Sequence, residues 1–425
     1  MVRSARLLLS LCLLLCAVGC DRQQETEEPI RGFISVSGED LITPDGEKFF
    51  IQGTSLGNWL NPEGYMFGFE KTNAPWMIER MISQLVGPDE AKRFWSDFKD
   101  QYITREDIDF IASTGANTIR LPFHYKLFTD EDYMGLTGEQ DGFARIDSLV
   151  SWCRDAELYL ILDMHDCPGG QTGDNIDDSD GYPWLFESEA SQALFCDIWR
   201  EIALRYADEP VVLGYELMNE PIAPYFDSME ELNAKLMPLY KRAIAAIREV
   251  DQDHIIILGG SQWNGNFEPI TEWDYDDRLI FTCHRYGGSP EQEAFQYLID
   301  FRDRAERPMF MGETGHNTLE WQSQLVSMMR ANNIGYLFWP YKKVDGSCMV
   351  AVTRPEGWQS IIDFAEAPRA TYQEVRMARP DQVESLRTLE SFLESIRFAN
   401  CKVQEDYIRS LHFTNHDTDN NLTNN

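Results

Sequence analysis

The sequence predicts an α/β fold, specifically a (β/α)8 TIM barrel with additional C-terminal helices. Eight short apolar runs of strand composition recur along the chain, and helical patterns fill the intervals between them. This alternation indicates parallel strands joined by crossover helices, and eight repeats over roughly 320 residues are the sequence signature of the barrel. The length of 425 residues would also suit two ordinary domains, so the alternation carries the prediction.

The predicted strands are short and lie at barrel spacing. In chain order they are Phe49 to Thr54, Thr118 to Pro122, Tyr159 to Met164, Val211 to Leu217, Ile255 to Leu258, Leu279 to Cys283, Met309 to Met311 and Tyr336 to Trp339. Helical patterns between them cover Phe143 to Ala156, Ser188 to Tyr206, Glu230 to Val250, Glu291 to Arg304 and Leu319 to Ala331. In such a barrel we expect functional side chains just past the C-terminal ends of the strands.

The N-terminal segment is predicted to be a targeting signal that does not belong to the fold. Two arginines precede the apolar stretch Leu7 to Leu15, and small residues lead from it to Cys20. This arrangement is typical of a secretory signal over residues 1–19, and its end resembles the cleavage site of bacterial lipoproteins, in which the cysteine is lipidated. We therefore expect Cys20 to anchor an acidic tether over residues 20–32. The expected protein is secreted through the envelope and held at the outer membrane or cell surface by this lipid alone.

The barrel is predicted over residues 33–370, and helices that pack on it over residues 371–413. In this second region apolar residues recur at helical spacing, which predicts an amphipathic helix. These residues are Val383, Leu386, Leu389, Leu393 and Ile396. The polar, Asn-rich end of the chain, residues 414–425, is predicted to be a disordered tail.

The composition argues against several classes of partner. The chain carries 71 acidic and 37 basic residues, a formal net charge of -34, whereas binding to nucleic acid depends on Lys and Arg. A neutral substrate fits better, and no nucleic-acid partner is expected. Six of the nine cysteines follow Cys20 at wide spacing, which predicts buried free thiols and neither a disulfide framework nor a zinc site. We expect a monomer without a metal or other cofactor.

Two glutamates, Glu220 and Glu313, end short apolar runs and are followed by residues that stop a strand. A carboxylate at the exit of a buried strand is costly unless it is paired or used. Two such groups at one end of a barrel suggest a carboxylate pair, which hydrolysis of a glycosidic bond requires. Either one alone could also be a strand-end glutamate in an ordinary ion pair. The other polar side chains at the strand ends favour a catalytic rim; they are Arg120, His124, His165, Asp166, Asn219, His284 and Tyr286.

These residues resemble glycoside hydrolase family 5, the cellulase-like retaining β-glycosidases. The likeness runs from about Gly53 to Trp339. It rests on several short motifs that occur in order and at barrel spacing: Ile119-Arg120, His165, Asn219-Glu220-Pro221, His284-Arg285-Tyr286, Gly312-Glu313 and Trp339. The resemblance implies a retaining hydrolase that cleaves β-glucosidic linkages of glucans or gluco-oligosaccharides, with Glu220 as the acid/base and Glu313 as the nucleophile.

The resemblance also implies roles for the neighbours of the two glutamates. Arg120 is expected near Glu313, where its charge would keep that carboxylate ionised. Asn219 is expected to bind the sugar 2-hydroxyl, and Tyr286 to hydrogen-bond the nucleophile. His165 and His284 would bind sugar hydroxyls or shift the pKa values of the carboxylates. Each of them could instead be an ordinary structural histidine.

Tryptophans are candidate platforms for sugar rings. Trp339 ends the last predicted strand and offers a flat apolar face for the ring at the cleavage site, with a core position as the alternative. Trp59, Trp184 and Trp263 fall on predicted rim loops. Each of these three is either a further platform or a core residue.

Two segments, Gly53 to Leu60 and His165 to Gly173, resemble the exo-β-1,3-glucanase branch of the family. The match is incomplete, because Asn58 stands where that branch usually carries glycine. The second segment also continues into an acidic stretch, Asp174 to Asp180, which predicts a solvated loop. A calcium loop is the alternative, although the stretch lacks a full EF-hand pattern.

Other functions stay open at the level of sequence. The substrate could be a β-mannan or another β-glycoside of the same family, and a non-catalytic, lipid-anchored glycan-binding protein would need the same fold. A metal-dependent hydrolase could use His165, Asp166, His284 and Glu313. No His-x-His pair or His-Glu-x-x-His helix supports that last alternative.

Overall fold

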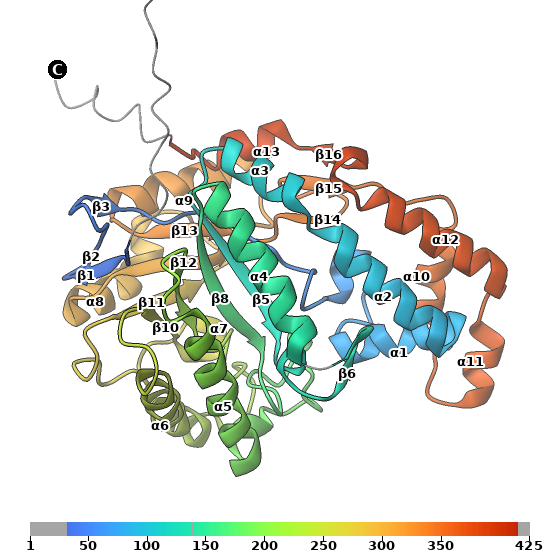
Figure 1. Ribbon diagram of the computed structural model, residues 1–425, viewed down its shortest axis with the longest axis horizontal. Helices are drawn as coiled ribbons and strands as arrows, with labels where there is room; N and C mark the ends of the chain where they lie inside the picture. The colour runs from blue at the N-terminus through green and yellow to red at the C-terminus, as the bar shows by residue number, and fades with distance from the viewer. Residues whose placement is uncertain (1–31, 138, 415–425) are drawn as a thin grey trace, which may run out of the picture.

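The structure is a computed structural model that describes residues 32–137 and 139–414. The predicted signal peptide, Cys20, the acidic tether up to residue 31 and the tail from residue 415 onward lie outside the described residues. Eight parallel strands close into a barrel that helices surround (Figure 1). The predicted (β/α)8 fold is therefore confirmed.

The barrel strands are buried over nearly their whole length, which is why they read as continuous apolar runs. In chain order each strand pairs with the next, and the last pairs with the first. The strands are β4 (Gln52–Ser55), β5 (Thr118–His124), β8 (Tyr159–Asp166), β9 (Val212–Glu216), β10 (Ile255–Gly259), β11 (Leu279–His284), β12 (Met309–Thr314) and β13 (Gly335–Phe338).

The first predicted strand, Phe49 to Thr54, is two strands in the structure. Its beginning belongs to β3 (Lys48–Phe49), which forms a small antiparallel sheet with β1 (Ser35–Ser37) and β2 (Asp40–Ile42). Only β4 enters the barrel. The apolar side chains of the small sheet pack with those that fill the barrel interior, and these include Leu41, Phe49, Ile257 and Phe310. Phe49 is therefore buried by this cap and not by the barrel wall.

Each of the five predicted helices is present, with ends shifted by a few residues. They are α4 (Glu139–Asp155), α5 (Glu189–Tyr206), α6 (Met229–Arg248), α8 (Gln296–Ala305), which follows η4 (Gln292–Phe295), and α9 (Leu319–Ala331). The long connection from β4 to β5 holds three helices that the sequence patterns left unassigned: α1 (Pro75–Val86), α2 (Pro88–Tyr102) and α3 (Arg105–Ser113). The remaining short elements are η1 (Gly64–Phe67), η2 (Tyr125–Phe128), β6 (Asp132–Tyr133), β7 (Leu136–Thr137), η3 (Trp184–Phe186) and α7 (Ser261–Asn264).

The chain after β13 covers one side of the barrel. It adds a three-stranded sheet and further helices: β14 (Lys342–Val344), β15 (Val350–Val352), α10 (Trp358–Glu366), α11 (Tyr372–Ala378), α12 (Gln382–Ser395), η5 (Phe398–Asn400), β16 (Lys402–Val403) and α13 (Glu405–Ser410). Helix α12 packs against α1, α2 and α10 (Figure 1). Its buried face includes Leu389 and Phe392, whereas Val383 is 56% exposed and was wrongly assigned to that face.

Two further observations concern the described part of the chain. Its six cysteines are free, and all but the half-buried Cys401 are buried, as the spacing predicted. None of its helices combines the length and apolar character needed to cross a membrane.

Candidate active site

A cavity of about 400 Å³ opens where the barrel strands end. Its wall combines carboxylates, imidazoles and aromatic rings from loops that are far apart in sequence. The lining residues are Glu63, Tyr65, His165, Ile176, Asn219, Glu220, Tyr286, Glu313, His316 and Trp339. The structure therefore brings most of the predicted rim residues into one cavity, and Arg120 and His284 contact them from within the barrel.

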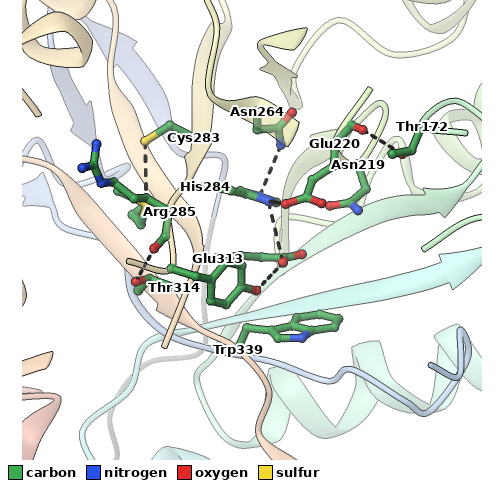
Figure 2. Close-up of polar contacts among 12 residues, drawn as sticks. Thr172, Asn219, Glu220, Asn264, Cys283, His284, Arg285, Glu313, Thr314 and Trp339 are labelled. Atoms are coloured by element: carbon green, nitrogen blue, oxygen red, sulfur yellow. Dashed lines mark hydrogen bonds and ion pairs between the residues drawn. The ribbon is translucent and has the colours of Figure 1, made fainter. Parts of the chain in front are cut away.

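The two predicted glutamates face each other across this cavity. Glu220 follows β9, and Glu313 lies on β12. Carboxylate oxygens of both, together with an imidazole nitrogen of His284, lie within 4.8 Å of one another. Figure 2 shows His284 next to both carboxylates, with Nδ1 at 2.8 Å from Oε1 of Glu220 and 3.7 Å from Oε2 of Glu313.

Glu313 is held on both oxygens. Nη1 of Arg120 donates to Oε1 at 2.6 Å, and the hydroxyl of Tyr286 donates to Oε2 at 2.6 Å. Both partners were predicted from the sequence. Two short hydrogen bonds, one to each oxygen, fix the orientation of the Glu313 side chain.

Arg120 is the centre of a buried charge cluster beneath the cavity. Its neighbours in sequence, Ile119 and Leu121, belong to the apolar cluster that the barrel shares with its helices, so the two-residue period of β5 turns Arg120 inward. It is fully buried and donates to Glu216 at 2.7 and 2.8 Å, in addition to Glu313. A further nitrogen contact of 2.9 Å joins it to Asp163. One guanidinium therefore compensates three buried carboxylates.

Sequence reasoning missed Asp163 and Glu216, although a signal existed. Both are charged residues inside otherwise apolar barrel strands, β8 and β9, which pair so that the two residues are neighbours. Burial raises the pKa of Asp163 to about 8 although Arg120 opposes the shift, and the pKa of Glu216 is raised for the same reason. A charge in a strand buried on both faces needs a partner, and the inward-facing Arg120 was the available one.

The environment of Glu220 differs from that of Glu313. Burial raises the pKa of Glu220 to about 7, while Arg120 opposes this shift and Asp174 adds to it. The backbone at Glu220 has a positive φ of 44°, and the hydroxyl of Thr172 donates to its carbonyl at 2.7 Å (Figure 2). Strained backbone of this kind persists where the surroundings enforce it, often at functional sites.

His284 and Asn264 form a short hydrogen-bonded chain behind Glu220. Burial lowers the pKa of His284 to about 4, so the ring is neutral near pH 7. The amide of Asn264 donates to Nε2 at 3.2 Å, which assigns the proton to Nδ1, and Nδ1 then donates to Glu220 (Figure 2). Asn264 was not predicted, because it lies on the short helix α7 in a loop without periodicity.

A second chain joins His165 and Asn219. Burial lowers the pKa of His165 to about 3, and its Nδ1 lies 2.7 Å from the Asp163 carboxylate. The amide nitrogen of Asn219 contacts Nε2 of His165 at 3.3 Å, and the amide oxygen accepts from Arg120 at 2.8 Å. The side chain of Asn219 is therefore oriented by two partners before any ligand binds.

Trp339 forms one wall of the cavity. Its ring is parallel to that of His165, with centroids 5.2 Å apart, and its indole N–H donates to the hydroxyl of Tyr65 at 2.6 Å. A Cβ on Gly57 would lie 2.8 Å from the indole ring, so only a glycine at position 57 leaves room for the ring. Figure 2 shows the ring beneath Glu313.

Glu63 is a cavity residue that the sequence did not reveal. Its side chain is only 4% exposed, and within residues 32–137 and 139–414 its carboxyl group has no hydrogen-bond partner. Burial first, and then the nearby Glu313 and Glu220, raise its pKa well above the usual range. Its oxygens are therefore available to a ligand in the cavity. It lies in the long loop after β4, whose course no periodic pattern predicts.

Comparison with known proteins agrees with this geometry. A model of the family described as Cellulase (glycosyl hydrolase family 5) matches residues 80–344, which is more than half of the chain. The chain belongs to glycosyl hydrolase family 5. It is accordingly a glycoside hydrolase, and the resemblance found in the sequence motifs is confirmed at the level of the family.

Curated relatives match different shares of the chain. A β-xylosidase of Phanerodontia chrysosporium is 31% identical over 236 residues, 55% of this chain and 48% of that protein. Endoglucanase C of Acetivibrio thermocellus is 26% identical, over 59% of this chain and 88% of the relative. A probable glucan 1,3-β-glucosidase A of Aspergillus fumigatus is 29% identical, over 51% of this chain and 52% of that protein. The chain thus spans about half the length of the first and third of these relatives.

Solved structures support the fold. A rutinosidase from Aspergillus niger superposes with a TM-score of 0.57 at 19% identity, covering 70% of this chain and 90% of that one. A β-glucanase from Saccharophagus degradans in complex with cellotetraose gives 0.53 at 19% identity, with 86% and 94% covered. At this identity the likeness concerns the barrel architecture alone.

Two rim residues of this family 5 chain do not face the cavity. Nε2 of His124 lies 3.0 Å from Asp166 and 2.9 Å from Asp178, and its Nδ1 accepts from the backbone of Lys126. Burial opposes a charge on His124, but the two aspartates outweigh it and raise its pKa to about 9. These contacts join the three side chains in one buried cluster that ties the loop after β8 to the barrel.

The acidic stretch after β8 is not the solvated loop that its composition predicted. Asp177 is fully buried and accepts from the backbone N–H groups of Thr172, Gly173 and Ser179. Asp178 accepts from the backbone of Trp76 at 2.8 Å, besides its contacts with His124. The acidic side chains therefore replace missing backbone partners in an irregular segment, which composition alone cannot reveal.

The three further tryptophans separate into two classes. Trp59 is 1% exposed and donates from Nε1 to the carbonyl of Lys99 at 2.8 Å, so it is a core residue and no sugar platform. Trp184 and Trp263 are 48% and 38% exposed. These two remain available to a ligand.

Proposed function

We propose that the chain is a retaining β-glycoside hydrolase that cleaves β-glucosidic linkages of glucans or gluco-oligosaccharides by double displacement. The observation that carries this proposal is the close approach of Glu220 and Glu313, with oxygens within 4.8 Å of each other in unlike environments. Carboxyl groups about 5 Å apart leave no room for a water molecule between acid and base, which inversion would require. The separation therefore supports retention.

The surroundings of the two glutamates support a division of labour. Glu313 accepts from Arg120 and Tyr286, which hold its carboxylate in place for attack on the anomeric carbon. Glu220 has a pKa raised to about 7, so it can hold a proton for the leaving oxygen near neutral pH. After the first step, the deprotonated Glu220 would take a proton from the attacking water, and the bond between C1 and Glu313 would break.

The other cavity residues would bind the sugar. The preoriented amide of Asn219 suits the 2-hydroxyl, a contact that strengthens in the transition state. Trp339 offers an apolar face at the bottom of the cavity. In this scheme His165 orients Asn219, and the neutral His284 tunes Glu220 through its hydrogen bond.

The assignment to glucans rests on the relatives. Endoglucanase C and the probable glucan 1,3-β-glucosidase A have names that refer to glucans, whereas the β-xylosidase does not. A β-mannan or another β-glycoside is therefore the alternative substrate. The net charge of -34 is consistent with a neutral polysaccharide.

The test is a hydrolysis screen of the purified chain against β-1,3-, β-1,4-, β-1,6- and mixed-linkage glucans, mannan and xylan, with the products sized. We expect cleavage of at least one glucan, and proton NMR of the first product should show the β-anomer. Cleavage of mannan alone would mean that mannan, and not a glucan, is the substrate. No cleavage of any of these polysaccharides would favour a non-catalytic glycan-binding protein.

The pH dependence of hydrolysis should report the proton on Glu220. Because only the protonated form donates to the leaving oxygen, kcat/KM on a glucan should fall as pH rises through about 7. A 2,4-dinitrophenyl β-glucoside has a leaving group that needs no proton, so its kcat/KM should stay level over the same range. Equal alkaline losses for both substrates would contradict the acid role of Glu220.

We also propose that Cys20 carries a lipid that anchors the protein at the envelope, on the basis of the sequence motif described above. Expressed with its N-terminal segment in a bacterial host, the wild-type chain should fractionate with membranes, and Cys20→Ser should be released into the soluble fraction. Specific activity should be the same in both, because the barrel begins after the tether. Membrane association of the serine variant would disprove this anchor.

A further inference from the structure

Five aromatic side chains outside the cavity lining form a connected series of ring contacts, which we call the aromatic ledge. Neighbouring ring centroids are 4.8, 5.4, 5.0 and 6.3 Å apart along the series Trp184, Tyr182, Phe226, Tyr225 and Trp263. Tyr225 is 54% exposed, and the two tryptophans are similarly open. Scattered exposed aromatic residues need no explanation, but a connected series of this length indicates a binding surface.

Two residues of the ledge, Tyr225 and Phe226, lie on the same loop as Glu220. The segment after Glu220 pairs with the loop after β8, through the N–H of Ile222 to Gln171 at 2.9 Å and the N–H of Ala223 to Thr172 at 3.0 Å. Tyr225 follows directly, and its hydroxyl donates to the carbonyl of Gly173 at 3.3 Å. These hydrogen bonds fix the distance between the ledge and the candidate acid/base.

Gly173 allows the ledge to pack closely on this loop. A Cβ at Gly173 would lie 2.5 Å from the ring of Phe226, and its φ of 85° also favours glycine. The position of Phe226, in turn, supports the rings of Tyr182 and Tyr225 on either side. The ledge is thus a packed feature of the fold.

Trp263 is presented by an unusual turn. Three successive residues that are not glycine, Gln262, Trp263 and Asn264, have positive φ angles of 49°, 59° and 57°. The N–H of Gln262 donates to the carbonyl of Ile222 at 3.0 Å, which ties this turn to the loop of Glu220. Asn264 points inward to His284, while the neighbouring Trp263 is exposed. Such strain persists where a structure must hold a side chain in place.

We propose that the aromatic ledge binds the sugar units on the leaving-group side of the scissile bond, a step that rests on the proposed function. Trp339, Tyr65 and Glu313 lie together around the cavity, which suits the sugar whose C1 is attacked. The oxygen that Glu220 protonates joins this sugar to the next unit. That unit leaves the cavity past Glu220, where the loop continues into the ledge.

The chemistry of the ledge suits neutral β-linked glucose units. Their ring C–H groups form flat apolar faces that stack on aromatic rings, and Asp174 next to Tyr225 supplies acceptor oxygens for hydroxyl groups. A second copy of the chain is a poorer occupant, because two molecules with a net charge of -34 repel each other. The ledge should therefore favour longer substrates and sugar acceptors.

The first test uses the full chain with Tyr225→Ala, Trp263→Ala and Trp263→Phe on cello- and laminari-oligosaccharides of two to six units. For the wild type, each added unit on the leaving-group side should raise kcat/KM. Either alanine variant should reduce that gain by about tenfold, and Trp263→Phe should retain most of it. Tyr372→Ala, an equally drastic change at a residue that is 85% exposed on α11, is the matched control and should equal the wild type.

The second test measures transfer to an acceptor. In this step the bond between C1 and Glu313 breaks, a bond forms between C1 and an acceptor hydroxyl oxygen, and the hydroxyl proton passes to Glu220. With 2,4-dinitrophenyl β-glucoside as donor and cellobiose or laminaribiose as acceptor, the ratio of transfer product to glucose should fall about tenfold in both alanine variants. A change in stability alone would alter both products equally and leave this ratio unchanged.

The outcomes separate this inference from the proposed function. A wild-type chain that acts on neither the oligosaccharides nor the aryl glucoside overturns the proposed function and this inference with it. An active wild type whose chain-length gain and transfer ratio persist in both alanine variants overturns this inference alone. Dimers in sedimentation that Tyr225→Ala and Trp263→Ala dissociate would make the ledge a protein interface and also overturn it.

Discussion

Glu313→Gln should abolish turnover of every substrate, with kcat reduced by roughly 10⁴-fold or more. The amide cannot attack the anomeric carbon, so a better leaving group does not help. Gln nearly matches the size of Glu and can still accept from Tyr286, and Arg120 keeps Glu216 and Asp163 as partners. The fold should therefore survive. The measurement is kcat on a glucan and on a 2,4-dinitrophenyl β-glucoside, with the unfolding midpoint as the check on folding.

Glu220→Ala should block the second step of the reaction and leave the first step intact for substrates with a good leaving group. It removes proton donation to the leaving oxygen and base assistance to water, but it leaves the nucleophile in place. With the activated aryl glucoside, the variant should release dinitrophenol in a burst and then stop as the glycosyl-enzyme. Azide needs no general base, so adding it should restore turnover and give the β-glycosyl azide with retained configuration.

The azide product distinguishes the two roles. If azide instead rescues Glu220→Ala with the α-product and Glu313→Ala with the β-product, the nucleophile and the acid/base are exchanged. If neither glutamate affects hydrolysis, the reaction takes place elsewhere on the molecule. Glu268→Ala, a change at a glutamate outside the cavity lining, should leave both substrates unaffected and serves as the control.

Much of the fold could be predicted because the barrel strands are buried on both faces. Each strand therefore reads as a short apolar run, and the helices between them have one apolar face. The error at Phe49 to Thr54 shows the limit of this signal, since Phe49 is apolar for a different reason, namely the sheet that caps the barrel. Helices α1 to α3 were missed because they lie within a single long connection, where no alternation with strands draws attention to them.

The candidate site was predictable for residues in the barrel strands or soon after their C-terminal ends, and less so for residues of the long loops. Glu220 and Glu313 were found in this way, and the cavity contains both. Glu63 comes from a long loop whose course depends on tertiary packing. Trp59, on the same loop, was predicted to be either a sugar platform or a core residue, and it is a core residue. Adjacent positions on an irregular segment can thus have opposite environments, which no sequence period encodes.

Arg120→Met should give the largest loss of stability of any substitution considered above. It removes the guanidinium that contacts Asp163, Glu216 and Glu313, and three carboxylates then lie buried without that compensation. Removing one partner of a buried ion pair costs about 3–5 kcal/mol, so the unfolding midpoint should fall by roughly 6 °C or more. Glu313 and Asn219 also lose their orienting donor, and kcat/KM should fall by at least about 100-fold. Arg105→Met, which breaks exposed pairs with Asp109 and Asp155, should leave the unfolding midpoint close to that of the wild type.

The pH dependence of this loss identifies its cause. The pKa values of Asp163 and Glu216 are already raised, and without Arg120 they lie further above those of the unfolded chain, so the folded state binds more protons than the unfolded state. Stability then falls as pH rises from the unfolded pKa of about 4 through the raised pKa values of the folded state. The difference in unfolding midpoint between Arg120→Met and the wild type should accordingly be small at pH 4 and large at pH 8. A difference that is the same at both pH values would mean that Arg120 stabilises the barrel by packing, and that the buried charges beneath the cavity are not what it compensates.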